Sequence, residues 1–331
     1  MAKPIHFDFM ALRKVAMFVS LVFVLVSLVS LAIKQLNLGL DFVGGLAIEL
    51  HYPSQPDLAK IRAKLAEAGY ERVLVQSFGN ANNLLIRLPD ITPNIIKGNE
   101  STNADVKGTA IAGTNITSTD TVGTDIIRLM QESNPEAVLV ASDFIGAQFG
   151  EELKEQGTLG LIVALVMVML YIAFRFQFKF SLAAVAALLH DVIIILGVFS
   201  LFGLNFDLNV LVALLVVIGY SLNDTIVISD RIRENFRKLR KTSALDIINI
   251  SVNQTLGRTA VTSFTTLLVL VVLILFGGQA IYYLALALII GVVAGTYSSV
   301  YIAGTLMLWM KLDRQDLVLP QEQDDVNRAH D

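Results

Sequence analysis

The chain has 331 residues, of which 54% are hydrophobic and 16% are charged, and its formal net charge is −4. Soluble domains carry about 25% charged residues, so this composition and a mean hydropathy of +0.64 indicate a membrane protein. The chain has no cysteine, which excludes disulfides and thiolate metal sites, and we expect neither a cofactor nor a metal ion.

Six stretches are close to the length of about 18 or more apolar residues that a helix needs to cross a bilayer. The shortest carries no charge until Arg175. The first follows Arg13 and Lys14, but its apolar run is longer than that of a usual signal peptide and no A-x-A site follows. We therefore interpret it as an uncleaved anchor. The expected spans are 15–36, 157–174, 181–203, 208–229, 258–276 and 283–310.

The distribution of Lys and Arg predicts the orientation of these spans. Basic residues are concentrated in the loop 230–257 and occur in the connection 175–180, whereas the connections 204–207 and 277–282 contain none. By the positive-inside rule, the N-terminus (1–14), the basic loop and the tail (311–331) are expected in the cytoplasm. Residues 37–156 are then expected outside.

The external segment reads as a small α+β domain. Strand patterns at 46–53, 72–78, 84–89 and 136–146 alternate with helix patterns at 57–68 and 125–133, and GNANN between the second and third strands indicates a hairpin turn. The order βαββαβ predicts a ferredoxin-like arrangement. The Thr/Asn/Gly-rich tract 90–122 is predicted to be a flexible insertion. No spacing typical of a hydrolase site occurs here, which favours a domain that binds a ligand or transmits movement.

Asp224 lies inside the fourth expected span, about 9 Å from the boundary marked by Asp230 and Arg231. An ionisable group in the membrane is costly and is a functional candidate by default. Arg258 begins the next, antiparallel span and is expected at a similar depth. The two residues form either a proton-coupling pair or a static ion pair that fixes helix packing. Their polar neighbours Ser221, Asn223 and Thr225 are secondary candidates, as are Asp230 and Arg231.

Two further acidic positions are less specific. His190 and Asp191 lie in the third span, but adjacent helical residues point about 100° apart, so we do not expect them to form one site by themselves. Asp191 is either a second relay member or a satisfied hydrogen-bond acceptor. Asp207, between spans, is predicted to be a helix N-cap.

Other patterns have structural interpretations. Gly291, Ala294, Gly295 and Ser298 have the small-xxx-small spacing of packed membrane helices. The basic run 231–241 is predicted to be helical and to contact anionic lipid headgroups, with docking to a cytoplasmic partner as the alternative.

Several stretches closely resemble the SecF subunits of bacterial SecDF protein-export complexes, within the RND superfamily. They are LGLDFVGG (38–45), HDVIIILGVFSLFG (190–203), VIGYSLNDTIVISDRIRENFRKLR (217–240), QTLGRTAVTSFTTL (254–267) and LFGG (275–278). The resemblance covers nearly the whole chain except 90–122 and the tail. The family often has Thr where this chain has Val43, which leaves the Gly44–Gly45 turn intact.

The resemblance implies six transmembrane helices of RND type in the bacterial inner membrane and a ferredoxin-like periplasmic domain between helices 1 and 2. It implies a heterodimer with a SecD-like subunit, which works beside the SecYEG translocon and with YajC. Proton flow would help to pull unfolded exported polypeptide into the periplasm. Asp224 matches the family's membrane aspartate and Arg258 its arginine partner. No enzymatic reaction and no nucleic acid are expected.

Two other functions stay open from the sequence. One is a non-catalytic scaffold that stabilises the translocon, for which charge-neutral changes at Asp224 and Arg258 would be harmless. The other is half of an RND small-molecule efflux carrier, for which drug-dependent proton flux would be the evidence. Such carriers usually have twelve spans and two large external domains.

Overall fold

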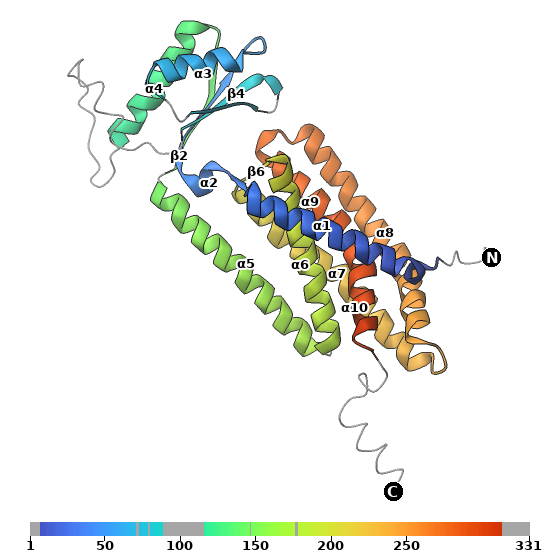
Figure 1. The fold of residues 1–331 in the computed structure, drawn as a ribbon. Helices are drawn as coiled ribbons and strands as arrows, with labels where there is room; N and C mark the ends of the chain where they lie inside the picture. Colours follow the sequence, from blue (N-terminus) through green and yellow to red (C-terminus); the bar gives the residue numbers. More distant parts are fainter. Residues whose placement is uncertain are drawn as a thin grey trace. The chain divides into compact units, whose positions relative to one another are not determined.

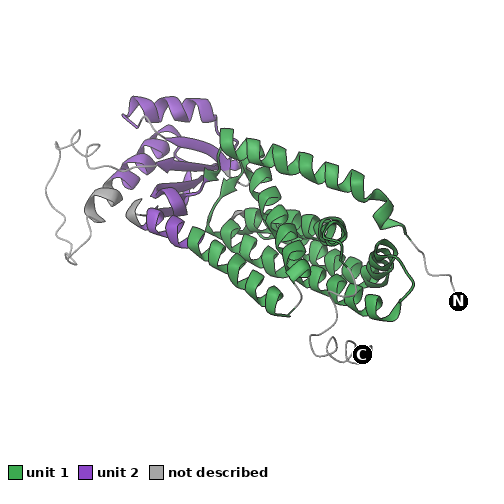
Figure 2. Cartoon of the chain, turned by 60° about the horizontal axis from the view of Figure 1, so that its bottom comes forward, with its two compact units in different colours: residues 1–37, 158–331 green, residues 38–157 purple. Residues whose placement is uncertain are grey.

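The computed structural model describes residues 7–70, 73–78, 80–88, 116–145, 147–175 and 178–312. The chain divides into two compact units, coloured separately in Figure 2. The first unit comprises Met1–Asn37 and Thr158–Asp331, and the second comprises Leu38–Gly157.

The first unit is built from long helices (Figure 1). Their bounds are η1 (Phe9–Leu12), α1 (Arg13–Ile33), α5 (Ala147–Arg175), α6 (Phe178–Phe202), α7 (Leu208–Lys238), α8 (Ala244–Phe276), α9 (Gln279–Ser298), the π-helix η3 (Ser299–Ala303) and α10 (Gly304–Trp309). The part of α5 before Thr158 belongs to the second unit. The two-residue strands β1 (Asn37–Leu38) and β6 (Asn205–Phe206) form a short sheet.

Six segments of the described chain are long and apolar enough to cross a membrane, as the sequence predicts. They are Phe9–Ile33, Phe149–Arg175, Phe178–Phe202, Leu208–Lys238, Ala244–Phe276 and Ile281–Trp309. The chain is therefore a multi-pass membrane protein. The segments differ in how much of their own most apolar stretch is buried. About half of that stretch is buried in α6, in α7 and in the last segment, whereas in the first, second and fifth segments it is mostly exposed. The helices α6, α7 and α9 thus form the centre of the unit.

The basic segment 230–257 is mostly helical rather than an open loop. The helix α7 continues to Lys238 and α8 begins at Ala244, which extends both helices beyond the expected spans. Lys, Arg and Glu are good helix formers. In addition, Glu234 accepts hydrogen bonds from Arg231 three residues before it and from Lys238 four residues after it, a spacing that supports helices.

Asp207 is the N-cap of α7, as predicted. Its carboxylate accepts a hydrogen bond from the backbone N–H of Val210 at 3.0 Å, so it satisfies a donor at the helix start. Ser243 caps α8 in the same way, and its hydroxyl also donates to Asp246 at 2.6 Å. Capping therefore fixes where the two long helices begin.

The second unit contains a four-stranded antiparallel sheet in the order β3-β4-β2-β5. Its elements follow the predicted order βαββαβ after the short helix α2. Their bounds are α2 (Leu40–Val43), β2 (Gly45–His51), α3 (Leu58–Glu67), β3 (Leu74–Phe78), β4 (Asn80–Leu88), α4 (Ile116–Ser133) and β5 (Val138–Ile145).

A hydrophobic core joins this sheet to α3 and α4, which lie on one side of it in Figure 1. The alternating residues Leu46, Ile48 and Leu50 of β2 are buried, as expected for one face of a strand. Leu65 of α3 and Ile126 of α4 belong to the same cluster. Apolar burial therefore accounts for the position of both helices on the sheet.

Gly44 and Gly45 form the turn between α2 and β2. Their φ angles are +73° and +120°, values that residues with a Cβ rarely adopt. The turn expected for the LGLDFVGG stretch is therefore present, with Val43 as the last residue of α2.

Most boundaries in this unit lie close to the predicted ones, but two differ more. The predicted flexible tract 90–122 is helical from Ile116, where α4 begins, and its residues 90–115 lie outside the described residues. The strand expected at 84–89 begins at Asn80. The reason for the second difference is backbone pairing, because Asn82 accepts a hydrogen bond from the N–H of Tyr52 and Asn83 pairs with His51. Such pairing overrides the low strand propensity of Asn.

Glu49 makes the stability of this unit depend on pH. Burial raises the pKa of Glu49, the Asp143 carboxylate adds to the rise, and a hydrogen bond from Asn83 opposes it. The folded state therefore binds this proton more tightly than the unfolded chain, so its contribution to stability falls as the pH rises through the pKa. We expect Glu49→Gln to stabilise β2 at pH 7 by about 0.5 kcal/mol or less, because solvent screens the group.

Amide hydrogen exchange of β2 in the full chain, corrected for intrinsic rates, measures this effect. The gain in stability from Glu49→Gln should vanish near pH 3. The exposed residue Glu67 provides the control variant Glu67→Gln. A gain of equal size at both pH values would show that burial of the charge is not the cause.

Candidate functional site

Asp224 lies in the middle of α7, with only 3% of its surface exposed. Its neighbours Ser221 and Thr225 are also buried, whereas Asn223 points to the exposed side of the helix. Within the described residues, Oδ2 of Asp224 is buried and has no hydrogen-bond partner. A buried carboxylate without a counter-charge or hydrogen bonds is destabilised as an ion. Asp224 is thus a buried acid with one oxygen that no hydrogen bond satisfies within the described residues.

Arg258 lies on α8, close enough to interact electrostatically with Asp224. The guanidinium is exposed, and no ion pair within 4.0 Å joins the two side chains. The structure therefore brings the two predicted partners into one region without a direct contact. A modest movement of α7 against α8 would change the distance between the two charges and hence their interaction energy.

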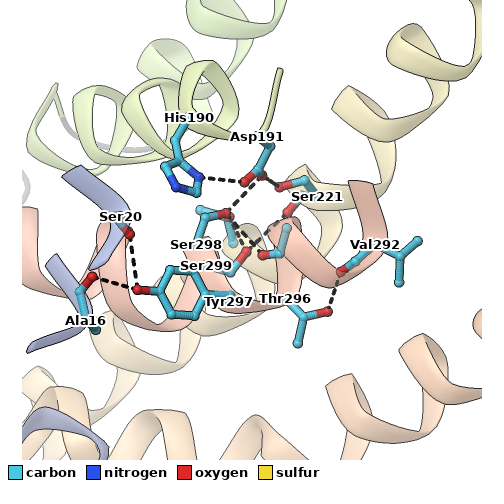
Figure 3. A network of polar contacts seen from close by, with 12 residues as sticks. Ala16, Ser20, His190, Asp191, Ser221, Val292, Thr296, Tyr297, Ser298 and Ser299 are labelled. Carbon is cyan, nitrogen blue, oxygen red and sulfur yellow. Dashed lines mark hydrogen bonds and ion pairs between the residues drawn. The ribbon is translucent and has the colours of Figure 1, made fainter. Parts of the chain in front are cut away.

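Asp191 is the centre of a separate polar network, shown in Figure 3. Its side chain is fully buried, at 0% exposure. Oδ2 accepts hydrogen bonds from Ser221 of α7 at 2.7 Å and from Ser298 of α9 at 2.8 Å. Nδ1 of His190 lies 3.1 Å from Oδ1. Both oxygens are therefore partnered, and the network links the three central helices.

His190 and Asp191, which we did not expect to form one site by themselves, are in contact within this larger network. Their Cα–Cβ bonds diverge, but the imidazole and the carboxylate both extend beyond Cβ and turn toward each other (Figure 3). The centroids of the His190 and Tyr297 rings also lie 6.3 Å apart. The Tyr297 hydroxyl donates to the backbone carbonyl of Ala16 at 2.6 Å and accepts from Ser20 at 3.1 Å, so α1 is tied to the same network.

A second set of hydroxyls leads from this network toward Asp224. Ser299 follows Ser298, and its hydroxyl lies 2.8 Å from that of Thr225, the residue after Asp224. Ser299 also donates to the backbone carbonyl of Ser221 at 3.5 Å. Ser299 is the first residue of the π-helix η3, and π-turns inside helices occur frequently at functional sites. The junction of α9 and η3 therefore contacts Asp191 through Ser298 and the neighbour of Asp224 through Ser299.

The remaining predicted residues lie elsewhere. Asp230 is exposed near the end of α7, and Arg231 bonds to Gln254 at 2.6 Å and to Glu234 at 2.5 Å. Together with Arg258 they line a cleft between α7 and α8. The structure thus divides the predicted residues into the buried network around Asp191, the unpartnered Asp224, and a charged cleft.

The sequence prediction missed the functional placement of Ser298, Ser299 and Tyr297. Ser298 was interpreted only as a small residue of the packing stripe, and the run TYSS (296–299) carries no known motif. The signal that could have found these residues is the cluster of four consecutive hydroxyls in an expected membrane span, where polar side chains need partners.

The packing interpretation of the glycines agrees with the geometry of α7 and α9. A Cβ on Gly291 would lie 2.2 Å from Cγ2 of Val217, and a Cβ on Gly295 would lie 3.0 Å from Cβ of Ser221. Only small residues let the two helices approach this closely.

We expect Gly291→Ala to lower the stability of the helical unit by about 1–3 kcal/mol, the usual cost of overpacking. The matched control is Gly219→Ala on α7, because a Cβ there meets nothing within 4 Å. Thermal unfolding of the two purified variants measures the difference. Equal midpoints for both variants would show that the contact between α7 and α9 can relax.

Comparison with known proteins identifies the family. Residues 125–313 match the model of the SecD/SecF protein export membrane protein, C-terminal, and residues 29–52 match the SecD/SecF GG motif. The SecF protein translocase subunit of Pseudomonas aeruginosa is 45% identical over 323 residues, which cover 97% of this chain and 96% of that protein. The chain belongs to the SecF family of protein translocase subunits. The SecF of Vibrio alginolyticus is 40% identical, with 95% and 92% covered.

Solved structures of SecDF share the fold of this SecF-family chain. SecDF of Thermus thermophilus, a translocon-associated membrane protein, matches with a TM-score of 0.80 and 32% identity over 93% of this chain. SecDF in its super-membrane-facing form matches with a TM-score of 0.65 and 31% identity over 98% of the chain. The chain spans only 39% and 41% of those two SecDF chains, so it corresponds to a part of each.

Proposed function

We propose that this chain is the SecF-type subunit of a complex that uses the proton gradient to assist protein export. The observation that carries the proposal is the state of Asp224, a buried carboxylate whose Oδ2 has no hydrogen-bond partner in the described residues. Arg258 lies within electrostatic range but outside ion-pair distance. A carboxylate whose counter-charge can approach or retreat can bind a proton in one helix arrangement and release it in another.

The second part of the proposal concerns what the proton movement does. One proton that crosses 100 mV releases about 2.3 kcal/mol. This energy biases two conformations only if protonation favours one of them. Protonation of Asp224 removes its attraction to Arg258, so α7 and α8 can repack. Hydroxyl contacts of Ser221, Thr225 and Ser299 connect α7 to α6 and to the last span, which supports transmission through the central helices.

The proposed topology puts both termini and the segment 230–257 in the cytoplasm of a bacterium, with the spans in the inner membrane. The second unit is then a ferredoxin-like periplasmic domain, which would contact the exported polypeptide and move with the RND-type helices. Its strand order β3-β4-β2-β5 with antiparallel pairs supports this fold assignment.

The proposed partners are a SecD-like subunit, the SecYEG translocon and YajC. The solved SecDF chains support the SecD-like partner, because the match to this chain covers only 39% and 41% of their length.

Cysteine labelling tests the topology, because the natural chain has no cysteine and single substitutions need no background changes. We expect Arg240→Cys to react with a membrane-impermeant maleimide only after the inner membrane is opened. Asn134→Cys, in the second unit, should react in intact spheroplasts. Labelling of Arg240→Cys in intact spheroplasts would contradict the cytoplasmic position of the basic segment.

Preprotein translocation tests the function itself. Inner-membrane vesicles with and without this chain should be compared in the presence and absence of a protonophore. We expect the chain to accelerate translocation only when the gradient is intact. An equal acceleration after the gradient is dissipated would make the chain a scaffold rather than a proton-coupled subunit.

A further inference from the structure

A cleft of about 670 Å³ lies between the adjacent ends of α7 and α8. Its walls are strongly basic, because five cationic side chains face only two carboxylates, those of Asp230 and Glu234. The five cations are Arg231, Arg233, Arg237, Lys238 and Arg258. Neither the capping of the helices nor the proposed proton site requires this many positive charges in one place.

Internal ion pairs neutralise only part of this charge. Glu234 accepts from both Arg231 and Lys238 at 2.5 Å. Within the described residues, Arg233, Arg237 and Arg258 have no carboxylate within 4.0 Å. The Nε atom of Arg233 is also buried without a hydrogen-bond partner among those residues. Among the described residues, the positive charges of Arg233, Arg237 and Arg258 are therefore not neutralised by a paired carboxylate.

The wall formed by α8 continues into an apolar surface. Arg258 begins a stripe at helical spacing that includes Val261, Leu268 and Val272. These three side chains are large, hydrophobic and exposed. On the opposite wall, Val227 of α7 also lines the cleft. A ligand with an anionic head and an apolar tail would match both parts of this surface.

We propose that the cleft binds the phosphate of an anionic phospholipid, whose acyl chains lie along the exposed stripe of α8. Arginine suits this role because its planar guanidinium can donate two parallel hydrogen bonds to one phosphate. Arg233 and Arg237 hold the headgroup from α7, and Arg258 does so from α8. The proposal rests on the placement of 230–257 at the membrane surface, and its test changes only Arg233 and Arg237, which the proposed proton coupling does not use.

The test measures retention of phosphatidylglycerol and of neutral phosphatidylcholine by the full chain in a neutral detergent, using native mass spectrometry. Each basic residue near an anionic lipid strengthens binding about fivefold. We expect Arg233→Gln with Arg237→Gln to weaken phosphatidylglycerol retention roughly 25-fold. The matched control removes the same charge through Arg240→Gln with Lys241→Gln, at two exposed positions outside the cleft, and should change retention by less than about twofold.

Four outcomes would overturn the proposal. They are equal losses in the two double variants, equal retention of the two lipids, displacement of phosphatidylglycerol by an equal concentration of inorganic phosphate, and stronger displacement by a glutamate-rich peptide. The third would assign the cleft to a soluble phosphate and the fourth to an acidic protein segment. Should the first double variant not fold, Arg237→Gln alone at its exposed position should still lower retention about fivefold. No proton gradient is present in this assay, so its failure would leave the role of Asp224 untouched.

Discussion

We expect Asp224→Asn to abolish the part of preprotein translocation that depends on the proton gradient, with normal levels of folded protein. The amide has nearly the size of the carboxylate, and Oδ2 of Asp224 has no hydrogen bond to lose among the described residues. The variant cannot bind and release a proton. Because one proton across 100 mV is worth about 2.3 kcal/mol, the largest bias that could be lost is about 50-fold.

The matched control for this prediction is Asp230→Asn, which makes the same chemical change at an exposed position six residues later on α7. We expect the control to retain gradient-dependent translocation. Wild-type rates for Asp224→Asn would mean that Asp224 and Arg258 serve only helix packing, and equal losses in both variants would indicate a general effect of charge.

Asp191→Ala, unlike Asp224→Asn, should cause a large loss of stability. The substitution removes the acceptor for the buried hydroxyls of Ser221 and Ser298 and the partner of His190. Ser298 keeps its hydrogen bond to the Gly295 carbonyl, so Ser221 and His190 are the two groups that lose their partner. Each such loss costs about 1–3 kcal/mol, so we expect the helical unit to lose about 2–6 kcal/mol in total. Thermal or denaturant unfolding of the purified chain measures this loss.

Asp191→Asn separates hydrogen bonding from charge. The serine hydroxyls can rotate and accept from the amide as well as donate to its oxygen, so we expect less than half of the loss seen with alanine. Asp230→Ala controls for removal of an acidic side chain from the surface. If Asp191→Asn kept full stability but stopped gradient-dependent translocation, Asp191 would be a second proton carrier rather than a structural acceptor.

Asp191 and Asp224 illustrate how a static structure separates two buried acids of the same type. Asp191 has partners for both oxygens on three helices, which stabilises one arrangement. Among the described residues, Asp224 has an unsatisfied oxygen and a counter-charge beyond ion-pair distance, which favours a change of arrangement when the charge changes. The proposed roles follow from that difference in hydrogen bonding.

The sequence predicted the spans well because a run of apolar residues has few alternatives to a membrane helix. It also placed Asp224 inside a span and Asp207 at a helix start, since an acid within an apolar run and a capping residue before one are local signals. The order of elements in the second unit was predictable from alternating and helical patterns for the same reason.

The contacts of the site could not be predicted in this way. Whether Ser298 meets Asp191, or Ser299 meets Thr225, depends on the rotation of α9 and on the π-turn at Ser299, which no local pattern indicates. The contact of His190 with Asp191 depends on side-chain torsions. The early start of β4 at Asn80 results from pairing with β2 and β3, so it too is a property of the folded chain.

Proton entry into proteoliposomes tests the proposed coupling most directly. The complex of this chain with its SecD-like partner and the translocon should be reconstituted with an internal pH indicator, and a gradient should be imposed while a preprotein is exported. We expect preprotein-dependent proton entry with the wild-type chain and none above the lipid background with Asp224→Asn. Unchanged proton entry in the Asp224→Asn complex would contradict the assignment of Asp224 as the proton-coupling residue.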